Sequence, residues 1–76
     1  MDPIHELANA IIELAAKDYR KALKDLHKNP QYAPAQAMKK DCEEFFLSGW
    51  FGVLTNLDGK VLMDDIRRMV KAEVAV

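Results

Sequence analysis

The residues best suited to binding chemistry gather between Phe45 and Arg68. This stretch holds the only tryptophan, all three glycines and a pair of adjacent arginines. An aromatic ring can stack on a base, and an arginine can hold a phosphate through two parallel hydrogen bonds. The same residue types are also favoured anchors in protein interfaces. We therefore predict a binding site with these members: Trp50, Phe51, Thr55, Asp58, Arg67 and Arg68.

No catalytic site is expected, because nothing pairs a nucleophile with a base. Cys42 is the only cysteine and falls on an apolar stripe, where a buried thiol is inert. His5 and His27 are about 33 Å apart along one expected helix, at a rise of about 1.5 Å per residue. The three glycines match neither nucleotide-binding loop pattern. The sequence predicts a protein that is not an enzyme and uses no cofactor.

The turn from Asn56 to Gly59 partly matches a calcium-binding loop. Its first position, however, is Leu54, which cannot coordinate a metal, and its last is Asp65, shorter than the usual glutamate. The alternative is that Asp58 accepts hydrogen bonds from backbone N–H groups where the next helix starts. We predict this cap, and no metal site.

The apolar periodicity predicts an all-α fold, a small bundle of three main helices with a short fourth helical turn. Asp2 and Pro3 suit the start of a first helix of about 24 residues, which Asn29–Pro30 ends. Pro34 falls in the first turn of the second helix, which ends at Ser48–Gly49. Ser48 then caps the short helical turn.

The last helix is expected after the Asp58–Gly59 turn, with a fraying tail beyond Lys71 because no stop signal follows. A short β-hairpin over residues 53–62 is the alternative, although an isolated hairpin is marginal in water. Trp50 and Phe51 point about 100° apart on a helix, so one is expected in the core and the other partly exposed. The residues expected to face inward in the second and last helices are Ala35, Met38, Cys42, Phe45, Phe46, Val61, Leu62, Ile66, Met69 and Val70. Those of the second helix expected to face out are Lys39, Lys40, Glu43 and Glu44.

Length and composition limit the class of protein. Residues 1–76 suffice for a single domain, and a core this small needs good packing or a partner for stability. Half of the residues are hydrophobic, so we expect a homo-oligomer. A net charge of −1 argues against a dedicated nucleic-acid binder. The chain shows neither a secretion signal nor an apolar run that would span a membrane, and we expect a cytoplasmic protein.

The segment from Phe45 to Arg68 resembles a family of small uncharacterised proteins encoded by phages and prophages of Firmicutes. The residues that carry the resemblance are Phe45, Phe46, Ser48, Trp50, Phe51, Leu54, Thr55, Asp58, Gly59, Leu62, Ile66 and Arg67. The first helix matches more loosely, from Ala10 to Leu23. The resemblance implies a phage-related origin and no established activity.

Small, non-catalytic phage proteins often act by stoichiometric binding and oppose host defences, which suggests two functions. In the first, an oligomer in the host cytoplasm sequesters a signalling nucleotide of a host immune enzyme in pockets between its subunits. In the second, the protein inhibits a host or defence protein, as anti-CRISPR proteins do. The mixture of Trp50, Asp58 and Arg67 in a chain that needs a partner subunit favours the first function. A DNA-binding regulator that uses the last helix is a third alternative, which the near-neutral charge disfavours.

Overall fold

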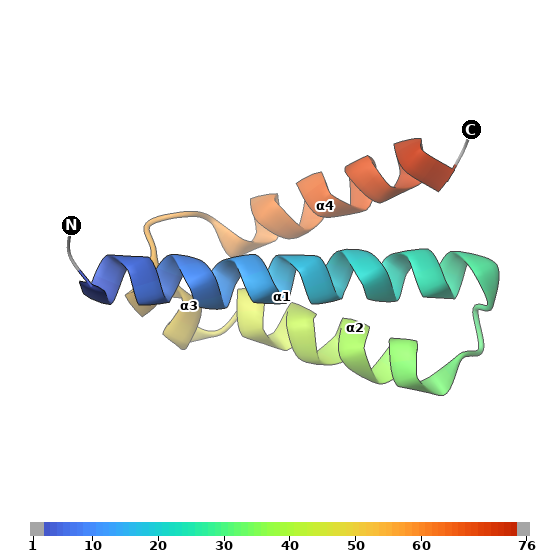
Figure 1. Ribbon diagram of the computed structural model, residues 1–76, viewed down its shortest axis with the longest axis horizontal. Helices are drawn as coiled ribbons and strands as arrows, with labels where there is room; N and C mark the ends of the chain where they lie inside the picture. The colour runs from blue at the N-terminus through green and yellow to red at the C-terminus, as the bar shows by residue number, and fades with distance from the viewer. Residues whose placement is uncertain (1–2, 75–76) are drawn as a thin grey trace.

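A computed structural model of the chain describes residues 3–74, which form four helices and no strand. Three are long and one is short, as Figure 1 shows. Their bounds are Pro3–Lys28 for α1, Ala33–Phe46 for α2, Gly49–Leu54 for α3 and Gly59–Val74 for α4. This confirms the predicted all-α bundle of three main helices and a short fourth. The expected capping residue Asp2 lies outside the described residues.

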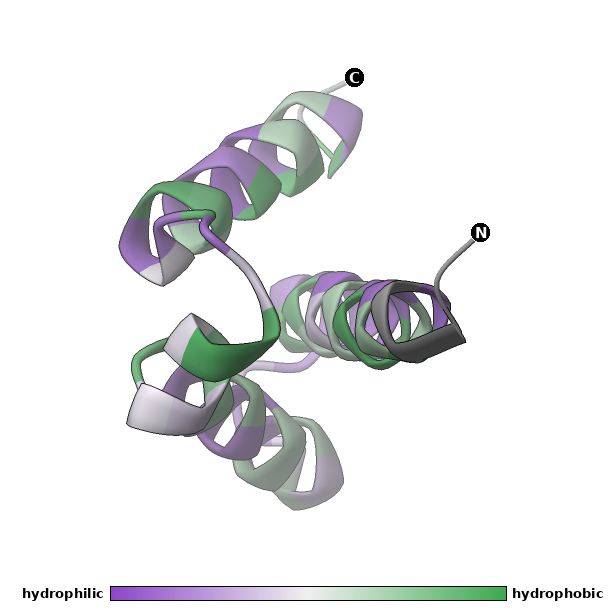
Figure 2. Ribbon diagram, turned by 90° about the vertical axis from the view of Figure 1, so that its left-hand side faces the viewer, coloured by the Kyte–Doolittle hydropathy of each residue, from purple (hydrophilic) through white to green (hydrophobic). Residues whose placement is uncertain are grey.

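The helices are arranged around α1, the longest. Figures 1 and 2 show α2 and α4 on different sides of α1, drawing apart toward the end where α1 finishes. The short helix α3 lies at the opposite end, near the start of α1. The bundle is therefore closed at one end by α3 and more open at the other.

Local signals set the helix boundaries where the sequence predicted them. The backbone N–H of Tyr32 donates to the carbonyl of Asn29 at 3.0 Å in the α1–α2 turn. The Phe51 N–H donates to the Ser48 hydroxyl at 3.3 Å and caps α3. The Lys60 N–H donates to Asp58 Oδ1 at 3.0 Å at the start of α4. The predicted Ser48 and Asp58 caps are confirmed. Residues 53–62 contain the end of α3, a turn at 55–58 and the start of α4, and they form no hairpin.

Gly59 allows a close approach between two helices. It is buried, and a methyl group added at its Cα would lie 1.8 Å from the carbonyl oxygen of Phe46. Since Phe46 is the last residue of α2 and Gly59 is the first of α4, backbone meets backbone here. Only glycine leaves room for this contact.

Aromatic rings fill the core near the α3 end. The ring centroids of Phe45 and Phe51 lie 5.7 Å apart, and those of Phe46 and Phe51 5.8 Å apart, both edge to face. Tyr19 meets Phe46 in the same way at 5.7 Å. The buried residues of this core are Ile12, Tyr19, Cys42, Phe46, Phe51, Met63, Ile66 and Val70.

Three expected core positions are wrong. Met38, Val61 and Met69 are 41%, 52% and 52% exposed, whereas Met63, which was not predicted, is buried. Because α4 begins with consecutive apolar residues, its sequence fits two helix faces. The Gly59 contact selects the face that carries Met63.

The predicted fraying after Lys71 is also wrong over the part that the structure describes. Helix α4 continues to Val74, and Glu73 pairs with Arg20 and with Lys24 of α1, the latter at 2.6 Å. These ion pairs anchor the last turn, where the sequence shows no local stop signal. Within residues 3–74, no helix is both long and apolar enough to cross a membrane.

Candidate functional site

The structure separates the two aromatic residues of the predicted site. Trp50 is 58% exposed, whereas Phe51, the next residue of α3, is 2% exposed and belongs to the core. The expectation of one core and one partly exposed ring is therefore confirmed. Only Trp50 exposes its ring, whereas Phe51 packs against Phe45 and Phe46 in the core.

The two polar residues of the α3–α4 turn shape the backbone. The Thr55 hydroxyl accepts from the Leu57 N–H at 3.2 Å, and Asp58 caps α4. Thr55 also lines a small hollow with Asn9 and Val53. The hydrogen bonds to nearby backbone N–H groups thus explain why polar residues occupy both positions.

Arg67 is held against the surface of the bundle by residues of two other helices. Its Nε donates to the Tyr19 hydroxyl at 2.7 Å, and its guanidinium also pairs with Glu43. The Tyr19 hydroxyl in turn donates to Glu43 Oε2 at 2.7 Å. We call these three residues the Tyr19–Glu43–Arg67 cluster. It joins α1, α2 and α4, so the prediction that Glu43 faces away from the bundle is wrong.

Arg68 points elsewhere and pairs with Asp65 on the same helix. Its side chain is 76% exposed. Arg67 and Thr55 line different hollows of the surface. The six predicted residues therefore occupy several places in the described fold.

The charges within the cluster shift its pKa values. Burial, followed by the hydrogen bond to Glu43, raises the pKa of Tyr19 to about 12. Burial also disfavours the charged form of Glu43, but hydrogen bonds from Arg67 and Tyr19 outweigh it and lower the pKa of that carboxyl. Hydrogen bonds to Glu43 and Tyr19 raise the pKa of Arg67. At neutral pH the cluster is a neutral phenol between a carboxylate and a guanidinium.

Sequence reasoning missed this cluster, because its members are 24 and 48 residues apart. One signal was present. A tyrosine on a buried stripe needs a partner for its hydroxyl, and Tyr19 lies on that stripe of α1. Its raised pKa makes the phenol a poor base or nucleophile. The cluster therefore ties three helices together.

Exposed apolar side chains gather around α3. Residues 45–57 contain no charged residue. Around α3 in this run, four large side chains are more than half exposed, and we call them the apolar end: Leu47, Trp50, Val53 and Leu57. Aromatic residues and a lack of charge distinguish the centre of protein interfaces from the rest of a protein surface.

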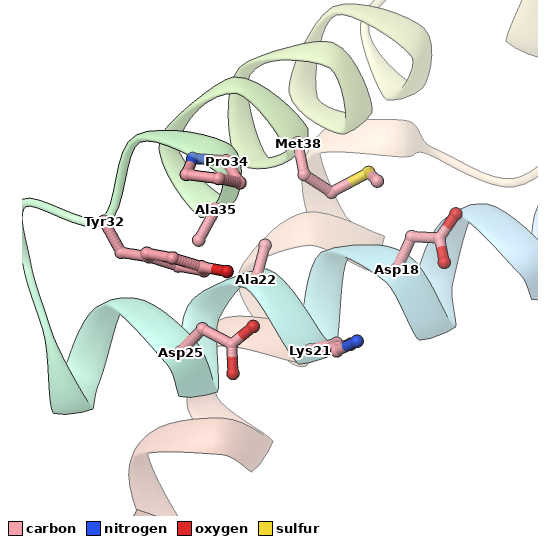
Figure 3. A pocket seen from close by; sticks show the side chains of 8 residues that line it. All are labelled: Asp18, Lys21, Ala22, Asp25, Tyr32, Pro34, Ala35 and Met38. Carbon is pink, nitrogen blue, oxygen red and sulfur yellow. The ribbon is translucent and has the colours of Figure 1, made fainter.

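The hollow in Figure 3 lies between α1 and the start of α2 and is a weaker candidate. Its volume is about 200 Å³, below the roughly 300–1,000 Å³ of small-molecule pockets. Its charged residues, Asp18, Lys21 and Asp25, all come from α1 and are of mixed sign. We assign no ligand to it.

Neither a reactive thiol nor a metal centre emerges from the described residues. Cys42 is buried, and burial, with smaller contributions from Asp18, Asp41 and Glu43, raises the pKa of its thiol to about 11. Among the described side chains, those of residues 6–74, no three His, Cys, Asp or Glu are grouped to hold a metal ion.

Comparisons with protein-family models, with curated proteins and with solved structures found no match for this chain. Any proposal for its function therefore depends on the surface of the molecule.

Proposed function

We propose that this protein is a non-enzymatic binding protein that docks stoichiometrically on another protein through the apolar end. The observation that carries the proposal is the exposure of Trp50, Val53 and their neighbours within a run of residues without charge. Contiguous exposed apolar side chains of this kind mark interaction sites on small proteins. The occupant that fits is an apolar surface of a partner protein. This corresponds to the inhibitor function suggested by the phage resemblance.

Nucleotide sequestration receives less support from the same residues. Arginine and lysine form the strongest hydrogen bonds to phosphate, and residues 45–57 contain neither. Arg67 is already paired with Glu43 and Tyr19, and Arg68 with Asp65. A nucleotide would have to displace these partners, whereas an apolar protein surface would not.

We also propose that the protein self-associates and that it acts inside a host bacterium. Ten large hydrophobic side chains are exposed among the described residues, which favours association of a chain this small. The resemblance to phage and prophage proteins favours action in the cytoplasm of a host bacterium, against a host or defence protein.

Photo-cross-linking tests the docking surface. A benzophenone side chain is placed at position 50, or at position 69, where Met69 is exposed to a similar degree on α4. We expect one protein adduct from position 50 in bacterial cells and none of that adduct from position 69. The purified partner should then bind one to one, and Trp50→Ala or Val53→Ser should weaken binding at least tenfold.

Met69→Ala is the matched control and should leave the affinity unchanged. The proposal is wrong if both positions give the same adducts, or if Trp50→Ala binds as tightly as the wild type. Adducts with lipid alone would indicate a membrane surface. A bound molecule of a few hundred daltons that Arg67→Ala releases would favour nucleotide sequestration.

A further inference from the structure

A groove with a basic rim lies at the open end of the bundle, away from α3. Its volume is about 570 Å³. Its floor is apolar, and every ionisable side chain that lines it is a base. We call it the basic groove, and it is lined by Leu23, Leu26, His27, Lys39, Arg67, Val70, Lys71 and Val74.

The groove is placed, and is long enough, to receive a helix. It lies where α2 and α4 draw apart over the last turns of α1, a gap that α3 covers only at the other end (Figures 1 and 2). From Arg67 to Val74 its α4 wall is about 10 Å long, at about 1.5 Å per residue. An amphipathic helix can lay its apolar face into such a groove with two turns.

The charge of the groove selects an acidic partner. Lys39, Arg67 and Lys71 contribute three positive charges. Glu43, which pairs with Lys39 at 3.7 Å and with Arg67, and Asp64, which pairs with Arg67 at 3.7 Å, offset two of them. The rim is positive after this compensation. An occupant with acidic residues beside its apolar face would complement it.

The chain itself carries such a segment. Leu7 and Leu14 of α1 are 64% and 61% exposed, and Ile11 between them is partly exposed. These three positions follow the i, i+4, i+7 spacing of helices that dock in grooves. The charged residues between positions 6 and 14 are both acidic, Glu6 and Glu13, and the next two, Lys17 and Asp18, offset each other. We call Leu7, Ile11 and Leu14, together with the neighbouring Glu6 and Glu13, the acidic ridge.

Acidic residues continue beside the ridge. A shallow apolar hollow next to Ile11 and Leu14 has Asp18 and Asp41 as its only charged lining residues. The ridge and the basic groove share no residue. One chain thus presents an apolar groove with a basic rim and an apolar ridge with acidic neighbours, and its own described helices cover neither.

We propose that the basic groove of one copy receives the acidic ridge of a second copy. The inference rests on the self-association proposed above and locates its interface. Because ridge and groove are different surfaces, the contact is head to tail. Each added copy leaves one ridge and one groove unoccupied, so the assembly closes into a ring or grows as a chain.

Two variants that each damage one surface test the interface. Leu7→Gln with Leu14→Gln removes the two leucine side chains of the acidic ridge. Lys39→Glu with Lys71→Glu reverses the charge at the rim of the basic groove. All four side chains are at least partly exposed, so both variants should fold, which circular dichroism checks. In sedimentation velocity at low salt, the wild type should associate. Each variant alone should associate at least tenfold more weakly.

Mixing the two variants gives the decisive result. The ridge variant keeps an intact groove and the groove variant keeps an intact ridge, so the equimolar mixture should form a dimer and nothing larger. Lys60→Glu with Arg68→Glu changes the net charge equally outside the groove and should associate as the wild type does. A mixture that stays monomeric, or a control variant that also dissociates, overturns the interface.

The remaining outcomes separate this inference from the proposals on which it rests. A wild type that is monomeric at all concentrations overturns self-association and the interface together. A wild type that associates while both variants associate equally well overturns the interface alone. If Trp50→Ala is then the monomeric variant, the copies meet through the apolar end. None of these results alters the cross-linking test of a protein partner.

Discussion

Tyr19 is the residue on which the packing of three helices converges. It is fully buried, yet its hydroxyl both donates to Glu43 and accepts from Arg67. A hydrogen bond to a charged group contributes about 1.5–3 kcal/mol to the free energy of unfolding. The phenol also forms a hydrogen bond with each member of the Glu43–Arg67 ion pair at the edge of the core.

Tyr19→Phe should lower the free energy of unfolding by about 1.5–3 kcal/mol at neutral pH. The pKa of Tyr19 rises from its ordinary 10.0 to about 12 in the fold, so the folded state favours the neutral phenol. The advantage over the variant is therefore present below pH 10 and is lost as the pH rises through about 12. Urea unfolding of both proteins across this range measures it.

Tyr32→Phe is the control for this experiment, because Tyr32 is 45% exposed. It should change stability by less than about 0.5 kcal/mol, as surface substitutions do. A constant difference between wild type and Tyr19→Phe up to the highest pH would contradict the role of the phenol.

For single residues, the sequence predicted what a side chain can do better than which residue it contacts. Trp50 was correctly paired with Phe51 as one exposed and one buried ring. Arg67 was chosen for its capacity to hold an anion, and it does bind a carboxylate, that of Glu43 in the same chain. No spacing rule connects residues 24 positions apart, so only the fold could reveal this pairing.

At the scale of elements, the contact between Gly59 and Phe46 sets how α4 meets α2. The contact is between backbone atoms, so no side chain can adjust to relieve a clash. Gly52 offers the contrast, since a methyl group at its Cα would meet nothing within 4 Å. The two glycines therefore have different reasons to be glycine.

Gly59→Ala should lower the free energy of unfolding by at least about 1–3 kcal/mol, the usual cost of overpacking. Gly52 lies within α3, so Gly52→Ala should raise the free energy of unfolding by about 0.4–1 kcal/mol. Thermal unfolding of both variants beside the wild type measures the difference. Equal stability of the two variants would show that α4 can shift without loss.

The helix boundaries were predictable because their signals are local. Asn29–Pro30 follows the last residue of α1, Ser48 caps α3, and Asp58 caps α4. The face that α4 buries was not predictable, because Val61 and Met63 are both apolar and only one can face the core. Contact with another helix made that choice, and contacts of this kind leave no local pattern.

At the scale of the whole molecule, the two ends of the bundle differ in how tightly they pack. Three phenylalanine rings and the Gly59 contact close the end near α3. At the other end α2 and α4 draw apart over the basic groove (Figure 1). Local unfolding should therefore cost less free energy at the open end.

Hydrogen exchange at low protein concentration should show this gradient within single helices. In α2, the amides of residues 43–46 should exchange more slowly than those of residues 38–40. In α4, the amides of residues 63–66 should exchange more slowly than those of residues 70–73. Uniform protection along both helices would mean that the bundle unfolds as one unit and that its open end is no weaker.

The backbone contact at Gly59 also gives α4 the mechanics of a lever. The fulcrum is the carbonyl oxygen of Phe46, and the arm from Gly59 to Val74 is about 22 Å long at about 1.5 Å per residue. A rotation of about 5° at the fulcrum moves the tip of such an arm by about 2 Å. A side chain at position 59 that forced α4 to tilt would therefore displace the Val74 end of the helix much more than position 59 itself.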